Sequence, residues 1–289
     1  MRARPSSTNA TRFNLSGKTC IVTGGTSGIG KEVARNLARM GGNVVLTCRD
    51  PAKGDATSSE ITASTGAQVT VACSDLSSLA SVRTLGRDLA ARYPRIDVLV
   101  NNAAIYTPRR QESRDGIELT WATNVLSYHA LTQLLLPSLK TASPSRIVNV
   151  ASTFAQSPNL EDLEYRRRRY SGTGAYRQSK AANRMLTWAI ARRLEGSGVT
   201  ANAVHPGGVA TGIYREVPGA LGTCFRAALA LFAKQPVAGA DTPTWTAAAP
   251  ELERVSAHFF VGRRERRCEF RDPVHEEQLW AICDAFIAR

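Results

Sequence analysis

A tyrosine and a lysine with helical spacing are the residues best suited to chemistry in this sequence. Tyr176 and Lys180 are one helical turn apart, so their side chains would lie on the same face of a helix. A neighbouring ammonium stabilises a phenolate and lowers the phenol pKa from its usual value of about 10. A phenol tuned in this way can donate a proton to a carbonyl oxygen or accept one. The pair therefore predicts a general acid/base.

A glycine-rich segment near the start of the chain predicts a phosphate-binding turn. Residues 23–30 read Thr-Gly-Gly-Thr-Ser-Gly-Ile-Gly and lie between a strand-like run and a helix-like run. Glycine permits close backbone approach, and the helix N-terminus offers unpaired N–H groups to a pyrophosphate. The spacing Gly-x-x-x-Gly-x-Gly differs from the Gly-x-Gly-x-x-Gly of the general dinucleotide fingerprint. Its place between strand and helix still predicts a dinucleotide site.

The end of the second strand-like run indicates which dinucleotide binds. Sites selective for NAD usually place a carboxylate there for the ribose 2′-hydroxyl, whereas an arginine suits a 2′-phosphate. Cys48 stands at that position and Arg49 follows it. A guanidinium matches a phosphate dianion through paired N–H donors, and Asp50 is expected to cap the next helix. We therefore predict NADP(H) rather than NAD(H).

Short apolar runs alternate with longer helical patterns along most of the chain. This alternation, with continuous apolar strands, predicts right-handed crossovers and a parallel sheet covered on both faces. We expect an α/β protein with a single-domain, doubly wound Rossmann-type fold and a mostly seven-stranded parallel sheet, over residues 15–289. The strand-like runs are 18–23, 43–48, 68–72, 97–101, 146–151, 200–205 and 257–261. The helix-like stretches lie near 28–40, 51–64, 77–92, 115–140, 175–196 and 236–248.

The composition is that of a globular chain with excess positive charge. Of the 289 residues, 43% are hydrophobic, which is ample for a buried core, and 37 Lys and Arg against 24 Asp and Glu give a formal charge of +13. Such a balance fits nucleic acid, an anionic membrane or simply a basic surface. Because no stacking-aromatic or recognition-helix pattern accompanies the arginines, we expect no nucleic-acid partner.

Residue spacing predicts neither a metal site nor a transmembrane anchor. The six cysteines and four histidines show no metal-ligand spacing, so we expect free thiols in a reducing compartment, the cytoplasm. No apolar run approaches the roughly 20 residues that span a bilayer. We expect the Arg- and Ser-rich residues 1–14 to form a disordered or flexible leader, with an organellar transit peptide as the alternative.

Further motifs, in their order along the chain, resemble those of the short-chain dehydrogenase/reductase superfamily. Besides Thr-Gly-x-x-x-Gly-Ile-Gly and Tyr-x-x-x-Lys, they are Asn101-Asn102-Ala103, Asn124, Ser152, Pro206-Gly207, Val209 and Thr211. Within the superfamily the chain resembles the retinol-dehydrogenase-like group. The stretches that carry this second resemblance are 48–50, 75–79, 144–150, 194–200 and 205–207.

The resemblance implies a role for each matching residue. Tyr176 would exchange a proton with the substrate oxygen, and Lys180 would hold the nicotinamide ribose and lower the Tyr176 pKa. Ser152 would hydrogen-bond the substrate oxygen, and Asn124 would anchor a water that links Lys180 to solvent. These four are the expected catalytic residues. The expected cofactor-binding residues are Gly24, Thr26, Ser27, Gly28, Ile29, Gly30, Arg49, Asp75, Leu76, Asn102, Ala103, Tyr176, Lys180, Pro206, Gly207, Val209 and Thr211.

The predicted activity is hydride transfer between NADP(H) and a hydrophobic ketone or aldehyde, or its alcohol. The aromatic and aliphatic segment at about 212–235 is expected either to cover an apolar substrate pocket or to pack on the core or a partner subunit. Two alternatives stay open: a non-catalytic NADP(H)-binding regulatory protein, and an epimerase or dehydratase that reuses the tyrosine. By analogy with relatives, a homodimer or homotetramer is expected.

One run of basic residues has no role in the predicted activity. Arg166 to Arg169 would lie in the loop between the expected catalytic serine and tyrosine. The run is either a solvated loop or a surface that steers an acidic substrate or contacts an anionic membrane.

Overall fold

Eight strands form one sheet in the part of the chain that the structure, a computed structural model, describes: residues 13–207 and 236–288. Their order is β3-β2-β1-β4-β5-β6-β7-β8, and every neighbouring pair is parallel except β7 and β8. The strands are β1 (Thr19–Val22), β2 (Asn43–Cys48), β3 (Val69–Cys73), β4 (Val98–Asn101), β5 (Ser145–Val150), β6 (Val199–His205), β7 (Phe259–Val261) and β8 (Arg264–Glu265).

The mostly parallel α/β sheet is confirmed, with one strand more than predicted. The additional strand, β8, has only two residues, and both are exposed. It is too short to show an alternating pattern of apolar and polar residues, which is the signal that identifies a strand in sequence. It follows a turn in which Gly262 and Arg263 both have positive φ.

Helices connect the strands and cover both faces of the sheet. They are α1 (Gly28–Arg39), α2 (Pro51–Thr65), α3 (Leu79–Arg92), α4 (Leu119–Trp121), the π-helical turn η2 (Ala122–Leu126), α5 (Ser127–Ala142), α6 (Gly172–Arg193), α8 (Pro236–Gly239), α9 (Asp241–Ala248), the 3₁₀ turn η4 (Pro250–Leu252) and α10 (Pro273–Ile287). The expected cap of α2 is confirmed, because the Asp50 side chain accepts a hydrogen bond from Lys53 N–H.

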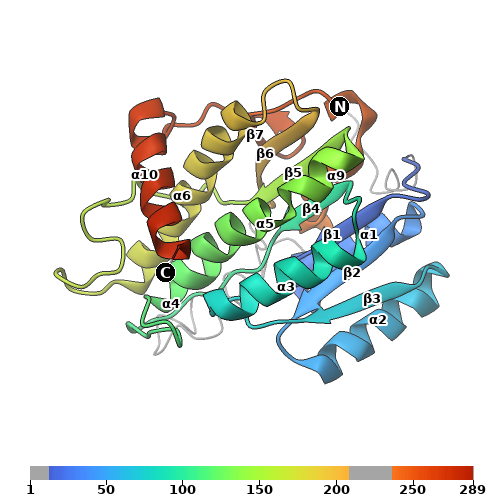
Figure 1. Ribbon diagram of the computed structural model, residues 1–289, viewed down its shortest axis with the longest axis horizontal. Helices are drawn as coiled ribbons and strands as arrows, with labels where there is room; N and C mark the ends of the chain where they lie inside the picture. Colours follow the sequence, from blue (N-terminus) through green and yellow to red (C-terminus); the bar gives the residue numbers. More distant parts are fainter. Residues whose placement is uncertain (1–12, 208–235, 289) are drawn as a thin grey trace, which may run out of the picture.

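The core has two layers, one on each face of the sheet. Side chains alternate between faces along each strand, so Ile21 and Leu99 pack with α3, α5 and α6, whereas Val22 and Val100 pack with α1 and α9. Figure 1 shows α3, α5 and α6 side by side across one face. The apolar runs of the inner strands are thus buried on both sides, as expected for a doubly wound sheet, whereas the edge strand β3 is partly exposed.

The last helix, α10, was not predicted from the sequence. It lies along α6 (Figure 1), where Arg193 stacks 4.1 Å from the centre of the Trp280 ring and pairs with Glu277. Its signals were present in the chain: Asp272 caps its N-terminus, and Pro273 occupies the first turn.

Buried amides join β4 and β5 where both strands end. Asn101 and Asn149 are paired in register, and the Asn101 amide donates to the Asn149 side-chain oxygen over 2.9 Å and to the Thr132 hydroxyl over 3.0 Å. The Asn149 amide donates in turn to the Thr187 hydroxyl over 2.9 Å. This chain of hydrogen bonds links the two strands to α5 and α6.

Some expectations fall outside the described residues. These are the segment 212–235 and residues 1–12 of the expected leader. Among the helices of the described ranges, none has the length and apolar content needed to cross a membrane.

Candidate active site

A cavity of about 750 Å³ lies at the carboxyl ends of the parallel strands. β2 lies on one side of β1 and β4 on the other, so the direction in which strands are added to the sheet reverses at β1. Ligands of doubly wound sheets bind at such a switch point. The wall contains both the glycine-rich turn and the Tyr176–Lys180 pair, which are far apart in sequence. The predicted residues on this wall are Gly24, Thr26, Ser27, Gly28, Ile29, Arg49, Asp75, Leu76, Asn102, Ala103, Ser152, Tyr176, Lys180, Pro206 and Gly207.

Among the described residues, two predicted ones are not on the wall. Gly30 and Asn124 lie behind it and are buried. Val209 and Thr211 belong to the residues that the structure does not describe.

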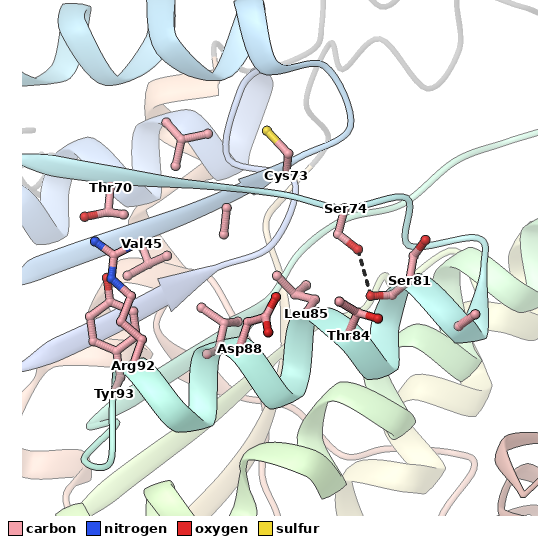
Figure 2. A pocket seen from close by; sticks show the side chains of 14 residues that line it. Val45, Thr70, Cys73, Ser74, Ser81, Thr84, Leu85, Asp88, Arg92 and Tyr93 are labelled. Carbon is pink, nitrogen blue, oxygen red and sulfur yellow. Dashed lines mark hydrogen bonds between the residues drawn. The ribbon is translucent and has the colours of Figure 1, made fainter.

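A second, smaller hollow of about 470 Å³ lies between β3 and α3 (Figure 2). Its wall includes Thr70, Asp88 and Arg92 but none of the residues predicted for catalysis or cofactor binding. The larger cavity is therefore the candidate active site.

The glycine-rich turn is packed so closely that side chains would not fit. A Cβ on Gly30 would lie 2.4 Å from both the side-chain nitrogen of Asn102 (Nδ2) and the Gly24 carbonyl oxygen. Gly24 has φ +65, and a Cβ there would lie 2.9 Å from the Cα of Ala103. Since Ser27 makes no side-chain cap, the first N–H groups of α1 donate no hydrogen bond to its hydroxyl. This turn fits the diphosphate of a dinucleotide.

Thr23 fixes this turn to the strand beside it, a role that sequence reasoning missed. Its hydroxyl accepts hydrogen bonds from the backbone N–H groups of Asn102 (2.8 Å) and Ala103 (3.1 Å). The side-chain amide of Asn102 donates in turn to the Thr23 carbonyl over 2.9 Å. The first threonine of the motif therefore holds the turns after β1 and β4 together.

Gly30→Ala is expected to weaken NADPH binding and to destabilise the fold by about 1–3 kcal/mol. The new methyl group would displace the Asn102 amide from its acceptors, and overpacking of this kind costs about that much. Calorimetric titration and urea unfolding measure the two effects.

Gly86→Ala is the matched control for this substitution. It also adds a methyl group inside a helix, but the nearest atoms belong to the Leu134 side chain, away from the cavity. It is expected to change stability while leaving NADPH affinity as it was. An equal loss of affinity in both variants would contradict the assigned role of Gly30.

Tyr176 and Lys180 lie together on α6, as the helical spacing predicted. Both are buried, with exposed fractions of 7% and 2%. The Lys180 Nζ donates to the Val150 carbonyl over 3.0 Å and lies 5.6 Å from the centre of the Tyr176 ring. Burial lowers the pKa of Lys180 to about 7. The ring of Tyr106, not predicted for the site, packs edge-on against Tyr176 with centroids 6.5 Å apart.

Asn124 lies in the π-helical turn η2 that joins α4 to α5. Its side-chain oxygen accepts from Ile105 N–H over 2.8 Å, and its amide donates to the Ile105 carbonyl and the Ser179 hydroxyl over 3.0 and 3.1 Å. The Ser179 hydroxyl donates to the Tyr176 carbonyl over 2.7 Å. The Asn124 side chain thus connects the loop after β4 to the helix that carries Tyr176. π-helical turns are frequent at functional sites.

Ser152 lies on the cavity wall in the loop after β5. Its hydroxyl accepts a hydrogen bond from Phe154 N–H over 3.0 Å. Its carbonyl accepts one from the guanidinium of Arg184, which is 4% exposed and stacks 3.9 Å from the centre of the Phe259 ring. Sequence reasoning missed Arg184, although it follows Lys180 by four residues and so shares a helix face with Tyr176 and Lys180.

At the opposite end of the cavity, Arg49 is exposed on the wall near Asp75. Partial burial raises the pKa of Asp75, but hydrogen bonds from Ser77 and then the charge of Arg49 outweigh it, and the net pKa is lowered. Asp75 accepts from the Ser77 hydroxyl over 2.7 Å. A cation and a carboxylate fixed by hydrogen bonds therefore lie together at this end of the cavity.

The basic run 166–169 is partly structural. Arg168 donates to the Gln178 side chain over 2.8 Å and lies 3.7 Å from the centre of the Tyr165 ring. Arg166 pairs with Glu164 over 3.1 Å. Arg166 is nevertheless exposed, as expected for a solvated loop, whereas Arg168 is half-buried between its partners. The side chains at 167 and 169 are exposed.

Comparison with known proteins agrees with this geometry. A family model described as short chain dehydrogenase matches residues 18–220. Retinol dehydrogenase 13 of Mus musculus is 38% identical over 279 residues, which cover 93% of this chain and 83% of the relative. A crystal structure of an uncharacterized protein from Mycobacterium paratuberculosis has a TM-score of 0.77 and 32% identity, covering 96% of this chain and 97% of that one. A short chain dehydrogenase from Burkholderia cenocepacia J2315 in complex with NADP has a TM-score of 0.69 and 27% identity, covering 86% and 96%.

The chain belongs to the short-chain dehydrogenase family, whose members are oxidoreductases that use a nicotinamide cofactor. Within the family it is similar to the retinol dehydrogenases. Both resemblances that were drawn from the sequence motifs are confirmed.

Proposed function

We propose that the protein is an NADP(H)-dependent oxidoreductase that interconverts a hydrophobic ketone or aldehyde and its alcohol. The observation that carries the proposal is the presence of Tyr176 and Lys180 on the wall of the same cavity as the glycine-rich turn. A retinoid is a reasonable first substrate to test, because the relatives are named retinol dehydrogenases.

In this proposal Tyr176 is the general acid in reduction and the general base in oxidation. The nearby Lys180 ammonium, when charged, favours the phenolate and so lowers the cost of proton transfer. The Ser152 hydroxyl donates a hydrogen bond to the substrate oxygen. Asn124 and Ser179 are positioning residues, since they hold the helix and the loop after β4 in place. The bound nicotinamide supplies the hydride chemistry, and the protein supplies orientation and charge.

The glycine-rich turn would hold the diphosphate, and Lys180 would hold the nicotinamide ribose. Arg49 would pair with the 2′-phosphate, which distinguishes NADP(H) from NAD(H). Asp75 and Leu76 would lie beside the adenine, Asn102 and Ala103 beside its ribose, and Pro206-Gly207 beside the nicotinamide. Val209 and Thr211 would contact the carboxamide.

Arg49→Ala is expected to raise the Kd for NADPH by about 10–100-fold, the effect of losing a charge-assisted pair. The Kd for NADH is expected to change by less than about threefold, since NADH has no 2′-phosphate to pair. Fluorescence titration of both nucleotides measures this selectivity.

The matched control is Arg87→Ala, which removes an exposed arginine of α3 that does not line the cavity. It is expected to leave both dissociation constants unchanged. Cys48→Asp places a carboxylate where NAD-selective sites have one, and it is expected to shift the preference toward NADH. Unchanged selectivity in Arg49→Ala and Cys48→Asp would refute the assignment.

Turnover of a panel of apolar ketones and aldehydes, with retinaldehyde among them, tests the activity. NADPH consumption is followed for the native protein and for Tyr176→Phe. NADPH binding without any Tyr176-dependent turnover would favour the non-catalytic regulator instead. Product formation with the cofactor returned to its starting redox state would favour an epimerase or dehydratase.

A further inference from the structure

Two thiols meet at the rim of the cavity, where β2 and β3 end. Cys48 is the last residue of β2 and Cys73 the last of β3, and the two are paired in register. Their sulfur atoms lie 3.5 Å apart in a hydrogen bond, and Ser74 N–H donates to the Cys48 carbonyl over 2.7 Å. Adjacent strands lie about 4.8 Å apart, and disulfides span Cα distances of about 4.4–6.8 Å. A disulfide can therefore form here without separating the strands.

The two thiols differ in accessibility. Cys48 is 6% exposed, and a Cβ on Gly54 in the first turn of α2 would lie 2.7 Å from its sulfur. Cys73 is exposed on the edge strand of the sheet. Figure 2 shows its sulfur on the face of β3 opposite to Thr70 and Ser74, whose side chains point toward α3. An oxidant from solvent would therefore meet Cys73 first, with Cys48 directly behind it.

Burial, and then the hydrogen bond with Cys73, raise the pKa of Cys48 to about 12. Cys48 is thus held as a neutral thiol, so it is the less reactive of the two toward an oxidant. The first reaction with an oxidant belongs to the exposed thiol.

Each of the two cysteines is adjacent in sequence to residues of the predicted cofactor site. Cys48 lines the cavity and precedes Arg49, while Ser74 and Asp75, which follow Cys73, line the same cavity. To form a disulfide, the sulfurs must move from 3.5 Å to about 2 Å apart. This movement changes the wall beside Arg49 and Asp75.

We propose that Cys48 and Cys73 form a reversible disulfide when the protein meets a hydroperoxide, and that the disulfide weakens NADP(H) binding. Formation of the bond is independent of the proposed function, whereas its effect on NADP(H) rests on that function. The pair makes the adenosine end of the cavity sensitive to oxidants.

The chemistry takes place in two steps. The Cys73 thiolate attacks one peroxide oxygen and breaks the O–O bond, which gives a sulfenic acid and an alkoxide or hydroxide that takes up a proton. The Cys48 sulfur then attacks the sulfenic sulfur, and the S–O bond breaks as the hydroxyl leaves with the Cys48 proton as water. Two thiols lose two electrons in total, and the peroxide is reduced to an alcohol or water plus water. A dithiol reductant reverses the bond by exchange.

Peptide mapping tests the bond directly. After hydrogen peroxide treatment and tryptic digestion under non-reducing conditions, peptide 40–49 is expected to be linked to peptide 54–83 with loss of two hydrogens. The link is expected in the native protein and in Cys268→Ser, which removes a different, partly exposed thiol. It is expected to be absent in Cys73→Ser and after dithiothreitol.

NADPH titration, after removal of the peroxide, tests the effect of the bond. The oxidised native protein is expected to bind NADPH about tenfold more weakly than the reduced protein, as for one weakened charge-assisted hydrogen bond. Cys73→Ser, whose altered residue does not line the cavity, is expected to show the same Kd before and after peroxide. Dithiothreitol is expected to restore the affinity of the native protein.

Two results would overturn the proposal. Oxidation of Cys73 to sulfinic acid without any 40–49 to 54–83 link would rule out the disulfide. A quantitative link with unchanged NADPH affinity would rule out the coupling. If the reduced native protein does not bind NADPH, the proposed function fails, while the peptide map still decides whether the disulfide forms.

Discussion

Tyr176→Phe is expected to lower kcat for ketone reduction by about 10²–10⁴-fold, the range attributed to a positioned general acid. The substitution removes one hydroxyl from a residue that is 7% exposed and whose ring packs edge-on against Tyr106. Because the ring itself remains, NADPH affinity is expected to stay within about threefold of the native value. Steady-state kinetics and a binding titration on the same preparations measure both quantities.

Tyr128→Phe is the matched control. Tyr128 lies near Lys180, whose Nζ is 5.9 Å from the centre of its ring, but it does not line the cavity. Its hydroxyl is buried and has no hydrogen-bond partner among the described residues, and burial raises its pKa well above the usual value. Losing this hydroxyl is expected to leave kcat unchanged within about threefold. If the two phenylalanine variants behave alike, Tyr176 is not the general acid.

Lys180→Met is expected to remove most turnover and at the same time to stabilise the protein. Lys180 is 2% exposed, and within the described residues its ammonium donates a hydrogen bond to the Val150 carbonyl. Methionine fills a similar volume without a charge to desolvate. Loss of the cation near Tyr176 is expected to lower kcat by about 10²–10⁴-fold, as for loss of the acid itself.

The gain in stability is expected to depend on pH. The pKa of Lys180 is about 7 in the folded protein, lowered by burial, against 10.5 for an unperturbed lysine. Below pH 7 Lys180 is protonated in both the folded and the unfolded protein. The native protein then bears the full cost of burying the charge, on the order of a few kcal/mol. Between pH 7 and 10.5 the folded state loses its proton first, and this cost falls as pH rises. The advantage of Lys180→Met is therefore largest near pH 6 and disappears toward pH 10.

Urea unfolding at pH 6, 8 and 9.5 without nucleotide measures this difference. Lys140→Met is the control, because it makes the same change at an exposed lysine of α5. No pH-dependent gain is expected there. A gain in Lys180→Met that stays constant across these pH values would show that Lys180 does not titrate near 7.

The parallel sheet and its switch point could be predicted because their signals are local in sequence. Continuous apolar runs such as 43–48 mark strands that are buried on both faces. Glycines between the first strand and the first helix mark a close backbone turn, and the turn around Gly24 and Gly30 is packed against the loop after β4. These features require only residues that are near one another in the chain.

Other features depend on contacts that no local pattern encodes. The π-helical turn around Asn124 is continuous with the flanking helices, so periodicity alone does not reveal it. Arg184 is a positioning residue through its bond to the Ser152 carbonyl, a contact between segments 32 residues apart. The Cys48–Cys73 pair arises from strand register, which places residues 25 apart side by side. Such contacts follow from the tertiary structure.

The amide pair between β4 and β5 helps to fix the register of these two strands. If β5 slipped by one residue along β4, each of its side chains would move to the other face of the sheet. Asn101 and Asn149 would then lose each other, and a buried amide without a partner costs about 1–3 kcal/mol. The same slip would shift Ser152 relative to the loop that carries Asn102. The slipped register is therefore less stable than the native one, so few molecules would form a distorted catalytic centre.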